Sequence, residues 1–105
     1  MAWFYLVLAG TFEIGWPIGL KMAQEENTKL LGLGVAVFFM ALSGYLLFIA
    51  QKTIPMGTAY AVWTGIGAAG TFVVGVMIYG DPSSLVRYIG VALIILGVIV
   101  LKMGS

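Results

Sequence analysis

One acidic residue of this chain stands where a charge is costly. Glu13 is the only ionisable residue well inside an apolar stretch, since every other charge lies in a polar break or at the end of a stretch. A charged side chain near the centre of a bilayer costs roughly 2.5–3.5 kcal/mol on insertion scales. Loss of water favours the neutral form of a carboxyl group. Glu13 is therefore a candidate proton carrier that releases its proton when a cation arrives.

Three aromatic rings and one hydroxyl group could complete a site around Glu13. Trp16 follows it by three residues, so on a helix the indole lies beside the carboxylate and could hold a cation or donate its N–H. Tyr60 and Trp63 form a second pair with the same spacing, and Ser43 is the one serine or threonine of the second apolar stretch. We predict that these four residues line the pocket. The alternatives are a lipid-facing tryptophan and a serine that bonds its own helix.

Pro17 and several glycines indicate where helices bend or pack closely. Pro17 has no N–H, so the carbonyl of Glu13 loses its helical donor and the helix is expected to bend. Gly10 lies on the same stripe as Glu13, while Gly65 and Gly67 belong to a glycine-rich third stretch that is thin and bendable. Hinge motion and close packing are both expected at these positions.

The composition identifies the solvent in which these elements fold. Of 105 residues, 62% are hydrophobic and 9% are charged, and the mean hydropathy is +1.11. A soluble domain is about one-quarter charged, so we predict an all-α integral membrane protein. The chain has no cysteine and no histidine, which removes thiolate and imidazole chemistry. We expect no enzyme activity, no cofactor and no metal, and the net charge of +1 predicts no nucleic-acid partner.

Four apolar stretches are long enough to cross a bilayer as helices. Short polar breaks separate them, so neighbouring helices are antiparallel and the chain forms one four-helix domain. The fourth stretch carries Gly90 and Gly97 on one face, which predicts a packing seam between protomers. One such bundle leaves little room for a transport pathway, and we therefore expect an oligomer. The predicted spans cover residues 2–20, 30–50, 56–79 and 86–101 of the single domain 1–105.

The lysines and arginine do not fix an orientation in the membrane. With the N-terminus inside, Lys52 and Lys102 lie on the inner side, while Lys21, Lys29 and Arg87 lie on the outer side. The positive-inside rule needs a clear excess on one side. We therefore predict insertion in both orientations and an antiparallel dimer.

These features resemble the small multidrug resistance family of bacterial transporters over the whole chain. The resemblance rests on the four-span plan, on Glu13 and on the run PMGTAYAVWTGIG at residues 55–67. It implies an antiparallel homodimer in the bacterial inner (cytoplasmic) membrane, whose two glutamates bind either protons or one small cation. Exchange between inward-open and outward-open forms would then export the cation as protons come in.

Within that family, the sequence resembles the guanidinium exporters. Glu13, Trp16 and Ser43 match their pattern, and Tyr60 and Trp63 would complete an aromatic box. Drug-exporting members usually carry a small residue in place of the tryptophan. Guanidinium is planar with N–H donors on every side, which suits a carboxylate, a hydroxyl and confining rings. The resemblance implies proton-coupled export of guanidinium or small substituted guanidinium cations.

Other readings of the sequence stay open. Pro17 stands where the family pattern has a small residue other than proline, and a bend there could reshape the pocket for quaternary ammonium or other hydrophobic cationic drugs. Some family members work only as paired unlike subunits, so the chain could be one half of such a pair. It could also be a non-transporting membrane subunit. Replacing Glu13 by glutamine separates this last case, because assembly would survive in all cases while proton-linked transport would be lost only from a transporter.

Overall fold

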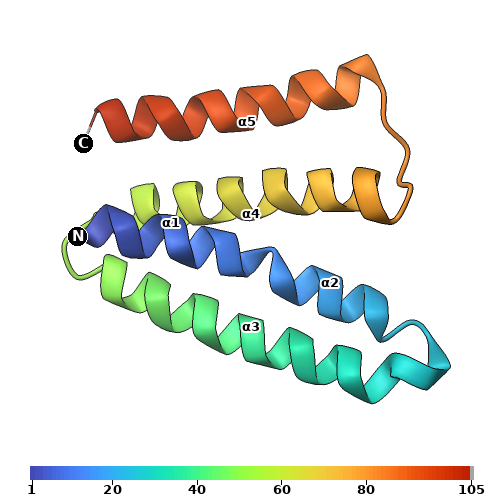
Figure 1. Ribbon diagram of the computed structural model, residues 1–105. Helices are drawn as coiled ribbons and strands as arrows, with labels where there is room; N and C mark the ends of the chain where they lie inside the picture. Colours follow the sequence, from blue (N-terminus) through green and yellow to red (C-terminus); the bar gives the residue numbers. More distant parts are fainter. Residues whose placement is uncertain (105) are drawn as a thin grey trace.

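The computed structural model describes residues 1–104, and within them the regular structure is helical (Figure 1). The first span is divided into α1 and α2, and each of the other three is one helix. All four spans are long and apolar enough to cross a membrane. This confirms the predicted all-α, four-span architecture. The elements are α1 (Ala2–Glu13), α2 (Gly15–Met22), the short 3-10 helix η1 (Glu26–Thr28), α3 (Lys29–Ala50), α4 (Met56–Ile78) and α5 (Leu85–Met103).

The ends of the spans follow local capping chemistry. The Ser84 hydroxyl accepts a hydrogen bond from the backbone N–H of Arg87 at 3.3 Å, and α5 begins at the next residue, Leu85. Just after α4, Gly80 adopts a φ of +68°, a left-handed conformation that glycine tolerates without strain. The hydropathy of a stretch carries no information about such caps. The helix ends in the structure therefore differ from the expected ones by up to two residues.

The first span is interrupted at Ile14. α1 ends at Glu13 and α2 begins one residue after Ile14, which produces the step visible between them in Figure 1. Pro17 explains the step, because it lies in the first turn of α2 and offers no N–H to the carbonyl of Glu13. Ile14 keeps helical dihedrals (φ −64°, ψ −30°), so the chain bends without reversing. The expected bend is present, but the single continuous helix over residues 2–20 is not.

The helices lie side by side as a thin slab. α1 and α2 pack on α3, α1 also packs on α4, and α5 packs on α4 (Figure 1). The extents of the molecule are 45 × 34 × 17 Å, so the slab is less than two helix diameters thick. Both termini lie at the same end of the slab, as an even number of spans requires. Most side chains are therefore at least partly exposed at the surface of the protein.

The interior depends on small residues. A Cβ added to Gly19 of α2 would lie 2.5 Å from the backbone nitrogen of Ala36 in α3, and one added to Gly32 would lie 2.6 Å from the carbonyl oxygen of Gly19. The two backbones can approach this closely only because both positions lack a side chain. At the end near the termini, a buried hydrophobic cluster is formed by Leu6, Ala50, Ile54, Ala59 and Val62.

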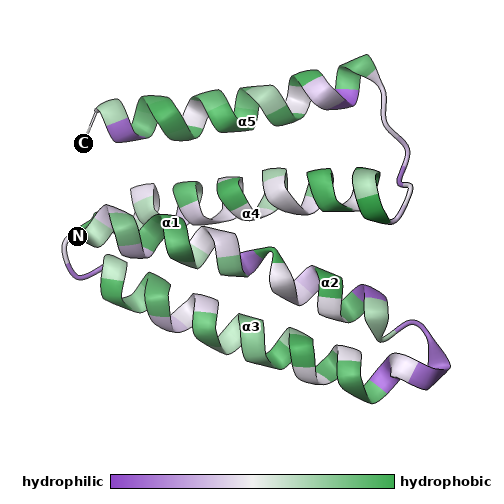
Figure 2. Ribbon diagram, viewed as in Figure 1, coloured by the Kyte–Doolittle hydropathy of each residue, from purple (hydrophilic) through white to green (hydrophobic). Residues whose placement is uncertain are grey.

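The helix α5 is the least covered element. None of its 19 residues is buried, and it meets α4 where Ile94 and Val98 pack against Gly65. Gly90 and Gly97 face open space, since nothing lies within 4 Å of a Cβ added at either position. In Figure 2 the ribbon of this helix is coloured mostly as hydrophobic, with hydrophilic residues near its ends. The expected protomer seam is thus an uncovered apolar face of the single chain.

Candidate functional site

Glu13 lies at the end of α1, directly before the break in the first span. It is the last residue of α1, and its side chain is half-buried. The side chain rests against α4 at Gly67, where an added Cβ would lie 2.5 Å from the Cγ of Glu13. Gly67 therefore provides the space that the carboxylate needs between α1 and α4. In this structure, Gly67 is a position of close packing between α4 and the Glu13 side chain.

A fully buried serine connects three helices behind Glu13. The indole N–H of Trp63 in α4 donates to the Ser43 hydroxyl in α3 at 2.8 Å. The Ser43 hydroxyl donates to the backbone carbonyl of Ala9 in α1 at 2.7 Å, and its oxygen also lies 3.5 Å from Oε1 of Glu13. A hydroxyl has one hydrogen to give, so the short bond to Ala9 dominates here. A small rotation would redirect the same hydrogen to Glu13.

Tyr60 joins the site through a ring contact. Its centroid lies 5.6 Å from that of Trp63, with an angle of 55° between the rings, and Tyr60 is 57% exposed. Along the axis of α4 it lies about 10 Å from Gly67, where Glu13 rests. The structure therefore brings Ser43 and Trp63 close to Glu13. Tyr60 lies beyond Trp63, which it contacts, and its side chain is exposed.

A groove of 260 Å³ opens beside Glu13, between α2 and α4. Trp16 lines it together with Glu13, so the two residues that the three-residue spacing paired lie in one groove although the helix is broken between them. The lining residues are Glu13, Trp16, Pro17, Thr64, Gly67, Ala68 and Thr71.

Some members of the site were not predicted from the sequence. Thr64 and Thr71 contribute hydroxyls to the groove wall, and the Thr64 hydroxyl donates to the carbonyl of Tyr60 at 2.8 Å. Their spacing of seven residues puts them on one face of a helix together with Ala68, and this pattern could have identified them. The carbonyl of Ala9 gave no such signal, because a backbone acceptor is present at every position of the chain.

The remaining glycines of the expected site are packing positions in this structure. A Cβ on Gly10 would lie 2.8 Å from Cβ of Ile66 in α4, and one on Gly65 would lie 2.8 Å from Cγ2 of Val98 in α5. Each glycine thus allows α4 to approach a neighbouring helix. Within residues 1–104, no three acidic, histidine or cysteine side chains gather as a metal site. The groove offers instead one carboxylate and one aromatic ring, that of Trp16, and such a pair can bind a small cation.

Comparison with known proteins agrees with this geometry. Residues 1–94 match the family described as Small Multidrug Resistance protein. The chain is 46% identical over its full length to a protein of Yersinia pseudotuberculosis named guanidinium exporter, all of which is covered. It is 42% identical to a guanidinium exporter of Escherichia coli K12, with all of this chain and 99% of that protein covered, and 40% identical to one of Proteus vulgaris over the full length of both. The chain belongs to the small multidrug resistance family, and it is accordingly a multi-pass membrane transporter and not an enzyme.

Proposed function

We propose that this protein exports guanidinium or small substituted guanidinium cations in exchange for protons. The observation that carries the proposal is the groove that Glu13 and Trp16 both line, with Ser43 and Trp63 behind the carboxylate. A planar cation with N–H donors can bond a carboxylate in a bidentate manner and stack on an aromatic ring. The relatives named guanidinium exporters support this choice of substrate.

Competition for one carboxylate would couple the two fluxes. Protonated Glu13 is neutral and has no charge to hold a cation, whereas ionised Glu13 attracts one. The Ser43 hydrogen would stay on the Ala9 carbonyl in the first state and turn to Glu13 in the second, since an ionised acceptor is the stronger one. Trp63 keeps the Ser43 oxygen in place in both states. The site would therefore carry either a proton or a cation. Release of the proton would allow the cation to bind, and release of the cation would allow a proton to bind.

We further propose that the working unit is an antiparallel homodimer. The single chain exposes 6,688 Å², compared with about 5,700 Å² for a compact soluble monomer of this mass. The uncovered face of α5 is the natural place for a second copy, and balanced charges allow the two copies to insert in opposite orientations. Two Glu13 side chains would then share one pathway, which a single thin slab does not enclose.

The experiment is uptake into liposomes that contain only this protein, with a proton gradient and either guanidinium or tetramethylammonium. We expect guanidinium transport that is lost in Glu13→Gln and kept in the matched control Glu25→Gln, which removes an exposed carboxylate outside the spans. Guanidinium transport that does not respond to the proton gradient would contradict the exchange. No transport of either cation by the wild-type protein would favour a paired unlike subunit or a non-transporting subunit.

Export of quaternary ammonium drugs is the second candidate, and Pro17 is the observation that favours it. Pro17 lines the groove and breaks the helix beside Glu13, so it could shape the wall for bulkier ligands. A quaternary ammonium ion has no N–H and would gain only charge and ring contacts. Uptake of tetramethylammonium in preference to guanidinium in the same liposomes would establish this alternative.

A further inference from the structure

A second groove continues from the one beside Glu13 toward the connection between α4 and α5. It encloses 130 Å³, and Pro17 and Thr71 line both grooves. The two spaces are therefore neighbours along the same wall of α2 and α4. The second groove differs from the first in its charges, since it carries one carboxylate and one ammonium group. Its other lining residues are Ile18, Lys21, Val74, Gly75, Tyr79 and Asp81.

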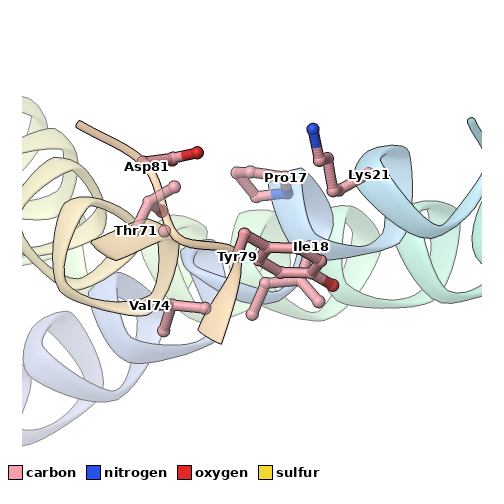
Figure 3. Close-up of a pocket in the computed structure, with 8 residues that line it drawn as sticks. Pro17, Ile18, Lys21, Thr71, Val74, Tyr79 and Asp81 are labelled. Atoms are coloured by element: carbon pink, nitrogen blue, oxygen red, sulfur yellow. The ribbon is translucent and has the colours of Figure 1, made fainter. Parts of the chain in front are cut away.

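The charged groups of this groove come from different elements, since Lys21 belongs to α2 and Asp81 to the connection between α4 and α5. Figure 3 shows the carboxylate of Asp81 and the ammonium of Lys21 on opposite sides of Pro17, with the Tyr79 ring near Ile18. Nζ of Lys21 lies 6.0 Å from the centroid of the Tyr79 ring, at the outer limit of a cation–π contact. The ring is therefore already placed to face a cation, and a carboxylate lines the same small space.

The backbone holds Asp81 at this position. Its N–H donates to the carbonyl of Gly75 at 2.9 Å, and Gly80 makes the required turn with its φ of +68°. A Cβ added to Gly75 would collide with the Asp81 carboxylate. The loop thus folds back over the last turn of α4 and keeps the carboxylate against the helix.

We infer that Lys21, Tyr79 and Asp81 form an outer cation site, which holds the substrate before it reaches Glu13. A guanidinium ion would bond the Asp81 carboxylate through its N–H groups and stack on the Tyr79 ring. Without substrate, the Lys21 ammonium lies near the Tyr79 ring. It withdraws as the substrate cation binds. The shared wall at Pro17 and Thr71 gives the bound ion a short route to the inner groove. This inference rests on the proposed function, because it needs a cationic substrate.

The consequence is a set of opposite effects on the KM for guanidinium uptake. Asp81→Asn removes the anionic partner and Tyr79→Leu removes the ring, so each should raise KM about fivefold, with a smaller change in the maximal rate. Lys21→Met removes the competing cation and should lower KM. Glu26→Gln and Lys29→Met are the matched controls, because they make the same charge changes in η1 and at the start of α3, at that end of the slab and outside the groove. Both controls should keep the wild-type KM.

The same measurements separate this inference from the proposed function. If the wild-type protein does not transport guanidinium, the proposed function fails, and the outer site for that cation fails with it. If the wild-type protein transports it and Asp81→Asn shifts KM no more than Glu26→Gln does, only general surface charge is at work and the outer site is overturned alone. An unchanged KM in Tyr79→Leu would also overturn it. Should Asp81→Asn fail to fold, Lys21→Met and Tyr79→Leu still decide the question through the opposite signs of their effects.

Discussion

At the scale of single residues, the Ser43 hydroxyl has one hydrogen and two acceptors within reach. The bond to the Ala9 carbonyl is 2.7 Å long, while the Glu13 oxygen lies at 3.5 Å, near the limit for a hydrogen bond. The N–H of Trp63 occupies the Ser43 oxygen from the other side. Ser43 can therefore change its acceptor without moving its oxygen, which allows it to respond to the charge on Glu13.

The space that Gly67 leaves for Glu13 gives a prediction at this scale. We expect Gly67→Ala to lower Glu13-dependent uptake by about tenfold to a hundredfold, because the new Cβ forces the carboxylate to move and shifts near 1 Å can cost that much. Initial rates of guanidinium uptake in liposomes measure the effect. Gly57→Ala is the matched control in the same helix, since nothing lies within 4 Å of its added Cβ. Equal rates in the two variants would show that Gly67 does not position Glu13.

Side chains with unusual chemistry were the part of the site that the sequence could predict. Glu13 was recognisable as a lone charge in an apolar stretch, and helical spacing linked it to Trp16, which lines the same groove. The interaction of Ser43 was harder to predict. The sequence left open whether its hydroxyl bonds its own helix, and the structure shows that it bonds α1 across a helix contact. Which backbone carbonyl receives it depends on how two helices are aligned, and no residue type records that alignment.

At the scale of helices, the break at Ile14 divides the first span into two parts with different neighbours. α1 packs on both α3 and α4, whereas α2 packs mainly on α3. The close approach at Gly19 and Gly32 fixes α2 to α3. A change of angle at Ile14 would therefore move α2 and α3 relative to α4 and alter the width of the groove at Trp16. The break is placed where the helix ladder already lacks a hydrogen bond.

The close contact of α2 and α3 gives a prediction at the scale of elements. Gly32→Val should lower the free energy of unfolding by about 1–3 kcal/mol, because the added side chain would press into the backbone of α2. Thermal unfolding of the purified protein in detergent measures the loss. Gly34→Val is the matched control in the same helix, at a position where an added Cβ meets nothing within 4 Å. The contact would be unimportant if both variants unfolded at the same temperature.

The four spans could be predicted because lipid imposes a length and a composition on each of them. The bend was also predictable, since Pro17 lacks an N–H. The sequence could not say which glycine meets which helix. Gly32 and Gly34 belong to the same apolar stretch, yet one touches the backbone of α2 and the other faces open space. That difference depends on the rotation of α3 about its axis, and a helix that is apolar on all sides gives little information about its rotation.

At the scale of the whole molecule, the thin slab exposes apolar surface on both of its faces and along α5. Lipid can cover such a surface, but it cannot enclose a pathway for an ion. A second copy packed on the slab would do so, and two orientations in one membrane would supply it. The shape and the charges both support the proposed antiparallel dimer.

Dual insertion can be tested with a single cysteine, because the natural sequence has none. In Gly104→Cys, we expect an impermeant thiol reagent to label about half of the protein in intact cells and all of it after permeabilisation, since neither orientation is favoured. Adding two lysines to the connection between α3 and α4 is the control, and it should shift the protein to one orientation. Labelling of nearly all or nearly none of the unmodified Gly104→Cys protein in intact cells would contradict dual insertion.

The separate position of α5 has a consequence for how this protein can change over generations. The helix touches α4 near Gly65 but contributes no residue to the groove beside Glu13. Mutations can therefore accumulate along α5 under little constraint from ion chemistry. After duplication of the gene, two copies could diverge into partners that recognise each other and no longer themselves, while both inherit an unchanged binding site.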